Sequence, residues 1–93
     1  MKEIELFYLT NCPYCNNARK AIDALQTENP AYRDIQIRWI EESREPELTE
    51  GHDYYYVPTI FYGGTKLYEA QPGQDYETIK ANVRRSFETV LQK

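Results

Sequence analysis

Two cysteines separated by two residues are the part of this sequence with the clearest chemistry. They are the only cysteines among the 93 residues, and they stand in the run Cys12-Pro13-Tyr14-Cys15. A thiolate is both a nucleophile and a metal ligand, so such a pair can exchange disulfides, bind a metal or remain inert. A structural zinc site needs about four ligands. The chain adds only one histidine, His52, to the two thiols, so we expect no metal site within a single chain.

The residues around the pair favour disulfide exchange. Pro13 suits the first position of a helix, because its missing N–H would have no partner there. Cys12 then lies at the helix entrance, where unpaired N–H groups and the positive end of the helix dipole favour the thiolate. Cys15 lies three residues before Ala18 and so falls on the inward stripe of that helix. We therefore expect Cys12 to attack a substrate disulfide and Cys15 to resolve the mixed disulfide.

Alternating and helical patterns of apolar residues predict the elements that position this pair. The helix that separates the first two strands makes them parallel, and a tight turn at Gly63-Gly64 makes the last two antiparallel. The sequence thus predicts an α/β fold of order β-α-β-α-β-β-α, in which helices flank a mixed four-stranded sheet. We expect strands at 3–8, 35–39, 57–62 and 65–70, helices at 13–28 and 76–90, and a short helical turn at 46–49.

Length and charge limit the classes of protein to which the chain can belong. Its residues fit a single domain, 1–93, without repeats or a linker. The net charge of −4 offers no electrostatic reason to expect nucleic acid or an anionic membrane as a partner. The first residues carry acids where a signal peptide would carry an apolar stretch. We expect a cytoplasmic monomer, in a reducing compartment where a permanent structural disulfide does not persist.

The pair and its surrounding elements resemble the glutaredoxins of the thioredoxin superfamily. The resemblance rests on the Cys12–Cys15 run and on Val57-Pro58-Thr59 before the third strand. It implies a thioredoxin-like fold, a cis peptide bond at Pro58 and a backbone pairing of Val57 with an extended substrate. It also implies a disulfide reductase of proteins or glutathione mixed disulfides that holds no tightly bound cofactor. Glutathione or a flavoprotein reductase would then return the pair to the dithiol. We expect three further substrate contacts, at Pro13, Tyr14 and Tyr56.

Two positions differ from glutaredoxins that use glutathione. A basic residue usually precedes the first cysteine by three positions, where this chain has Leu9. An acidic residue usually follows the Gly-Gly turn, where this chain has Thr65-Lys66-Leu67. Each missing charged contact is worth about 1–3 kcal/mol when it forms. The sequence therefore predicts weakened binding of glutathione.

Two other functions remain open at this point. Cys12 and an outside thiol could hold an iron–sulfur cluster or metal between two chains of a dimer, as a binding module without catalysis. Alternatively, the run Tyr54-Tyr55-Tyr56 could form the contact surface of a peptide-binding adaptor. The same tyrosines could instead pack alternately into the sheet.

Proton transfer at the pair has no obvious side-chain partner in the sequence. His52 stands alone in an acidic loop, which predicts a surface position rather than a catalytic base. Leu6 and Phe7 occupy the strand that leads to the pair, so we expect no carboxylate beside Cys15 and proton transfer through water.

Overall fold

The computed structural model describes residues 2–92 and contains the mixed sheet that the sequence predicts. The strand order is β2-β1-β3-β4, with β1 parallel to β2 and the other neighbours antiparallel. The bounds are Lys2–Tyr8 for β1, Ile35–Glu41 for β2, Thr59–Tyr62 for β3 and Thr65–Glu69 for β4.

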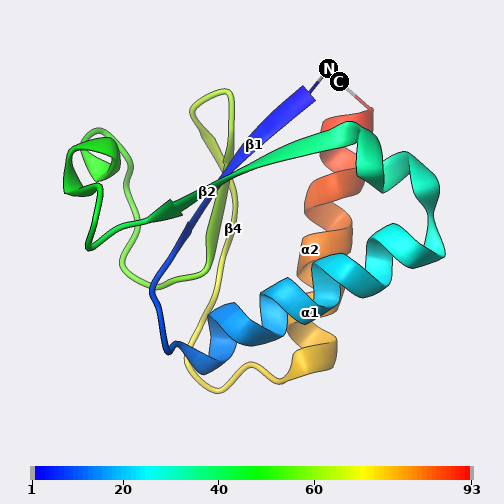
Figure 1. Cartoon of the computed structure of the whole chain (residues 1–93), viewed down its shortest axis with the longest axis horizontal. Helices are drawn as coiled ribbons and strands as arrows, with labels where there is room; N and C mark the ends of the chain where they lie inside the picture. The colour runs from blue at the N-terminus through cyan, green and yellow to red at the C-terminus, as the bar shows by residue number, and fades with distance from the viewer. Residues whose placement is uncertain (1, 93) are drawn as a thin grey trace.

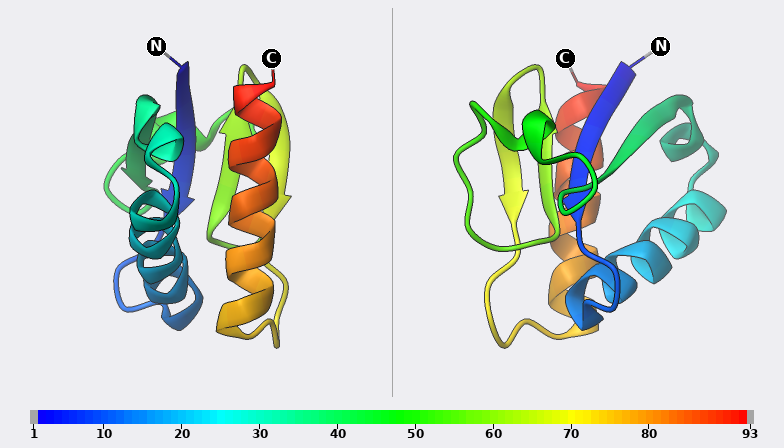
Figure 2. Two further views of the ribbon diagram at one scale, coloured as in Figure 1. Left: turned by 90° about the vertical axis from the view of Figure 1, so that its right-hand side faces the viewer. Right: turned by 60° about the vertical axis from the view of Figure 1, so that its left-hand side comes forward.

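Two long helices lie on one side of this sheet, as Figures 1 and 2 show. Helix α1 spans Pro13–Glu28 and α2 spans Tyr76–Leu91, which confirms both predicted helices. Asp75 caps α2, because its carboxylate accepts a hydrogen bond of 2.9 Å from the N–H of Thr78. The two helices pack against each other, so they cover the sheet as one layer.

The connecting segments contain two short 3-10 helices. The one at Pro46–Thr49, η2, is the helical turn that the sequence predicts. The other, η1 at Pro30–Asp34, is not predicted, since Asn29-Pro30 reads only as the end of α1. Asn29 starts this new turn, because its side-chain oxygen accepts a hydrogen bond of 3.1 Å from the N–H of Ala31.

Strand β3 is shorter than predicted. It begins at Thr59 rather than at Val57. Pro58 has no N–H to donate to a neighbouring strand, so ladder pairing with β1 starts only after it.

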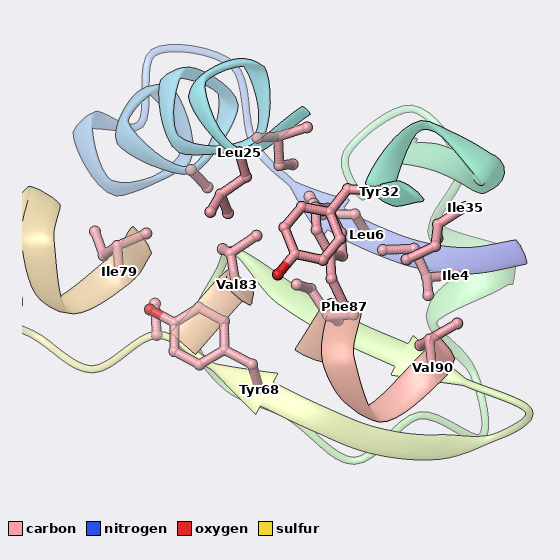
Figure 3. Packing of buried hydrophobic residues seen from close by; sticks show 14 residues of the cluster. Ile4, Leu6, Leu25, Tyr32, Ile35, Tyr68, Ile79, Val83, Phe87 and Val90 are labelled. Carbon is pink, nitrogen blue, oxygen red and sulfur yellow. The ribbon is translucent and has the colours of Figure 1, made fainter. Parts of the chain in front are cut away.

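The main hydrophobic core fills the space between the sheet and the two helices. Ile4 and Leu6 of β1 point into it, and Leu25, Val83 and Phe87 meet them from the helices (Figure 3). All of these side chains are fully buried. Burial of such apolar surface is the main term that holds α1, and with it the cysteine pair, against the sheet.

A smaller core covers the opposite face of the sheet. Phe7, Ile40 and Phe61 form it, and the segment that contains η2 closes over them (Figure 1). The ring of His52 lies 4.8 Å from that of Phe7 and 4.6 Å from that of Phe61. Its side chain is 19% exposed, so His52 is half-buried and packs more closely than the predicted surface position implies. No long helix covers this face among residues 2–92, and the loop must supply the rings that shield it.

The Gly63-Gly64 hairpin turn is confirmed, with φ values of 57° and 82°. Both values lie in the left-handed region that this tight turn requires. The register pairs Phe7 with Thr59 and Glu5 with Phe61, so the turn lies toward the first residues of β1. Cys12 follows the other end of β1, which places the turn at the end of the sheet remote from the cysteine pair.

Candidate active site

Cys12 is the N-cap residue of α1, as its position before Pro13 predicts. Its sulfur accepts a hydrogen bond of 3.2 Å from the backbone N–H of Cys15. The turn that precedes it contains Asn11, whose positive φ of 64° turns the chain from β1 into the helix. The side chain of Cys12 is half-buried, and its Sγ lies 3.9 Å from the carbonyl oxygen of Val57. A nucleophilic sulfur is thereby held at the positive end of a helix and open to one side.

Cys15 lies behind Cys12 and is 5% exposed. Both residues are free thiols. Burial raises the pKa of the Cys15 thiol to about 12, and its hydrogen bond to Cys12 adds to the increase. Cys15 therefore keeps its proton at neutral pH, while Cys12 is the residue that an incoming disulfide can reach. The helix stripe predicts this division into an outward-facing and an inward-facing thiol, and Cys12 is in fact half-buried.

The segment before β3 forms the wall facing Cys12. The Val57–Pro58 peptide bond is cis, which confirms that prediction. Pro58 is buried, and its carbonyl accepts a hydrogen bond of 3.0 Å from the N–H of Ala70. The hydroxyl of Thr59 donates to the carbonyl of Tyr56. These bonds fix the backbone on both sides of Val57.

Glu69 at the end of β4 holds the residues that lead into this wall. Its Oε2 accepts hydrogen bonds from the backbone N–H of Tyr55, at 2.7 Å, and of Tyr56, at 2.9 Å. Its Oε1 lies 2.8 Å from Nζ of Lys66. The bond from Lys66, with smaller contributions from the two backbone bonds, lowers the pKa of Glu69 to about 2. Sequence reasoning missed Glu69; the only signal was an acid at the strand end that pairs with the start of β3.

A family model described as Glutaredoxin matches residues 4–67, a segment that contains both cysteines and Val57-Pro58. The chain belongs to the glutaredoxin family. A comparison with curated protein sequences finds no match.

Solved structures show that the chain has a thioredoxin-like fold. The oxidised form of mitochondrial thioredoxin 3 from Saccharomyces cerevisiae superposes with a TM-score of 0.66 at 16% identity, over 95% of this chain and 77% of that one. Thioredoxin 1 from Thermosipho africanus superposes with a TM-score of 0.59 at 18% identity, over 98% of this chain and 99% of that one. Family and fold together support a thiol–disulfide oxidoreductase.

Some tyrosines near the site are packed against other rings or the core, and others are exposed. Tyr54 packs against Phe7 with 5.1 Å between ring centroids, whereas Tyr55 is 88% and Tyr56 47% exposed. Tyr14 packs against the main core, and its hydroxyl accepts a hydrogen bond of 2.7 Å from the N–H of Gly73. That bond joins the cysteine motif to the loop before α2.

The charge of one carboxylate acts on Cys15, although the strand that leads to the pair carries none. Glu42 directly follows β2, and its negative charge contributes to the raised pKa of Cys15. Parallel pairing sets Tyr8 beside Glu41, and the N–H of Glu42 donates to the carbonyl of Tyr8 at 3.1 Å. The next residues of both strands therefore emerge at the same end of the sheet. Sequence reasoning considered only the strand that leads to the pair.

Glu41 secures the turn that carries Cys12. Its carboxylate accepts hydrogen bonds from the N–H and hydroxyl of Ser43, at 2.7 and 2.6 Å, and from the hydroxyl of Thr10 at 3.0 Å. The bonds from Ser43, and then that from Thr10, lower the pKa of Glu41 to about 2. The end of β2 is thereby tied to the chain just before Asn11.

The segment 65–67 is not positioned to indicate which contacts form at the cysteine pair. It follows the Gly63-Gly64 turn, which lies at the remote end of the sheet. The loop that does reach the motif is the one containing Gly73, through its bond to Tyr14. The predicted location of one missing glutathione contact is therefore wrong, because the residues after Gly63-Gly64 extend from the far end. Leu9 remains at the site end of β1.

Between residues 2 and 92, no three His, Cys, Asp or Glu side chains gather in a way that could hold a metal ion. In the same part of the chain, no helix has the length and apolar character needed to cross a membrane.

Proposed function

We propose that the protein reduces disulfides through a dithiol–disulfide cycle of Cys12 and Cys15. The Cys12 thiolate attacks one sulfur of the substrate disulfide, and the other half of the substrate leaves as a thiolate that takes up a proton. Cys15 then loses its proton and attacks the Cys12 sulfur, which forms the Cys12–Cys15 disulfide and releases the second half. Two electrons pass from the protein dithiol to the substrate.

The observation that carries this proposal is the different placement of the two sulfurs. Cys12 stands at the N-terminus of α1 with its sulfur 3.9 Å from the Val57 carbonyl, and Cys15 is buried one turn further along. A partly exposed nucleophile with a protected second thiol is the arrangement that attack and resolution require.

The substrate class that this wall supports is a disulfide-bearing polypeptide or a glutathione mixed disulfide. An extended peptide can add to exposed backbone beside Cys12, as it does at the edge of a sheet. Val57 offers that backbone, with Pro13, Tyr14 and Tyr56 as proposed neighbours of the substrate.

The oxidised pair needs an outside reductant, and we propose glutathione or a flavoprotein reductase. Leu9 supplies no charge for a glutathione carboxylate, which favours weak glutathione binding. No tightly bound cofactor takes part in this cycle. We further propose a cytoplasmic monomer that contributes to electron transport and cell redox homeostasis, since a reducing compartment keeps the pair cycling.

Reduction of insulin and of hydroxyethyl disulfide tests the proposed function. We expect turnover by the wild type and none above background by Cys12→Ser. We expect Cys15→Ser to accumulate a mixed disulfide on Cys12 that mass spectrometry detects. Wild-type turnover no faster than that of Cys12→Ser would overturn the proposal. A thiol-dependent visible chromophore after anaerobic reconstitution would instead favour the cluster-binding module that uses Cys12 across a dimer.

A further inference from the structure

A groove of about 450 Å³ opens at the end of β1 that leads to Cys12. Leu9, one of its lining residues, leads directly into the turn that carries Cys12. Glu42, another, is close enough to Cys15 for its charge to act on that thiol. The groove therefore lies at the same end of the sheet as Cys12. Its lining consists of Leu9, Glu42, Ser43, Thr49, His52, Tyr54 and Tyr55.

Glu42 gives the groove a negative charge that the surrounding side chains do not neutralise. Its Oε2 accepts a hydrogen bond from the hydroxyl of Tyr54. Within the described part of the chain, its Oε1 accepts no hydrogen bond and no cationic side chain pairs with it. His52 also lines the groove, but its Nε2 lies 3.3 Å from the carboxylate of Glu5. One carboxylate oxygen thus remains available to a ligand.

The other walls suit a long side chain that ends in a cation. Leu9 offers an apolar surface on which a methylene stem can lie. Tyr55 is 88% exposed, and the bond from its backbone N–H to Glu69 holds its backbone in place. An aromatic face within reach attracts a cation through its quadrupole.

We infer that this groove binds a lysine or arginine side chain of the disulfide-bearing polypeptide. The inference rests on the proposed function and specifies its substrate class. The stem of the basic residue lies along Leu9, and its charged end meets Oε1 of Glu42 beside Tyr55. An acidic side chain at the same position would face the Glu42 carboxylate and be repelled.

Reduction of matched peptide disulfides tests the inference. Each peptide carries one cysteine in a mixed disulfide with a chromogenic thiol. Lysine, glutamine or glutamate occupies either the position before this cysteine or the position after it. At one of these positions, we expect the lysine peptide to have a kcat/KM about tenfold above that of the glutamate peptide, mainly through KM. The ratio should shrink as salt rises from about 0.1 M to about 1 M, because the Debye length falls from about 10 Å to about 3 Å.

The variant Glu42→Gln should reduce the ratio for lysine over glutamate to within about twofold. Glu47→Gln is the matched control, because it removes the same charge from an exposed residue of η2 outside the groove lining. We expect its ratio to equal that of the wild type. If Glu42→Gln folds poorly, two measurements still test the inference. One is the salt dependence of the lysine-over-glutamate ratio in the wild type. The other is the same ratio in Tyr54→Phe, which keeps the charge of Glu42.

The outcomes separate this inference from the proposed function. An enzyme that reduces all peptides equally well, or whose preference survives Glu42→Gln unchanged, would overturn the basic-residue groove and leave the reductase intact. A protein that reduces none of the peptides faster than Cys12→Ser would overturn the proposed function itself.

Discussion

At the scale of single residues, the two thiols differ because of burial. Cys12 caps a helix and faces outward, whereas Cys15 is packed behind it. Burial holds the pKa of Cys15 at about 12, with further contributions from Cys12 and Glu42. Once Cys12 is in a mixed disulfide, its contribution to the pKa of Cys15 changes. The contributions of burial and of Glu42 remain.

The resolving step should therefore depend on pH. Below the raised pKa of Cys15, the thiolate fraction grows about tenfold per pH unit, so the resolving rate should rise with pH through the neutral range. Because the charge of Glu42 raises that pKa, Glu42→Gln should lower it and speed resolution a few-fold at neutral pH. Stopped-flow release of a chromogenic thiol from the mixed disulfide measures the rate.

Glu47→Gln, with the same change in net charge, is the control for that measurement and should leave the rate unchanged. Slower resolution by Glu42→Gln would contradict the electrostatic expectation. It would indicate that the carboxylate helps Cys15 lose its proton.

At the scale of elements, the ends of neighbouring strands assemble the site. The end of β1 leads to Cys12, the segment before β3 supplies the wall at Val57, and the end of β2 brings Glu42. Glu69 at the end of β4 holds the chain before that wall.

Replacement of Glu69 should loosen the wall without removing the thiols. Glu69→Gln loses the ion pair with Lys66 and weakens the acceptor for the N–H groups of Tyr55 and Tyr56. We expect a loss of about 1.5–3 kcal/mol in the free energy of unfolding and faster hydrogen exchange at those two amides. KM for peptide disulfides should rise several-fold, whereas turnover of hydroxyethyl disulfide should change little.

Glu77→Gln, in the first turn of α2, provides a comparison that removes an acid elsewhere. Unaltered amide exchange at Tyr55 and Tyr56 in Glu69→Gln would show that the carboxylate does not hold this segment.

At the scale of the whole molecule, two cores hold one sheet. The helices cover one face, and a loop with a single 3-10 turn covers the other. Phe87 and Phe7 are fully buried, one in each core.

Truncation of these phenylalanines should separate the roles of the two cores. Phe87→Ala and Phe7→Ala should each lower the free energy of unfolding by about 3–5 kcal/mol. Only Phe7→Ala removes the ring that supports His52 and Tyr54. Under conditions where both variants are folded, we therefore expect only Phe7→Ala to lose the preference for basic peptides. Urea unfolding and peptide kinetics measure these effects. Equal loss of the preference in both variants would contradict this division.

Stability of the whole molecule should also fall in acid. Glu41 and Glu69 both have a pKa of about 2, below the ordinary value of 4.5. A carboxyl with a depressed pKa stabilises the folded state above its unfolded pKa and loses that contribution as pH falls toward the folded one. Urea unfolding from about pH 6 to about pH 3 should show this loss, and the double variant Glu41→Gln/Glu69→Gln should show a shallower slope. Identical slopes would contradict the assignment to these two residues.

Local patterns in the sequence are sufficient to predict the order of the elements and the identity of the reactive pair. These rest on local physics: the apolar period of each segment, the proline after Cys12, and the positive φ that Gly63-Gly64 permits. The inward position of Cys15 also follows, because three residues along a helix return to nearly the same face.

The residues that surround this pair could be identified only from the tertiary structure. Glu42 and Glu69 reach the site through strand register, which links residues far apart in the chain. His52 is half-buried against two rings because the loop must cover a sheet face that no long helix covers among the described residues. The Gly63-Gly64 turn lies at the remote end because of antiparallel pairing. Local patterns predict helices and strands, but which strand ends meet depends on how the strands pair across the whole sheet.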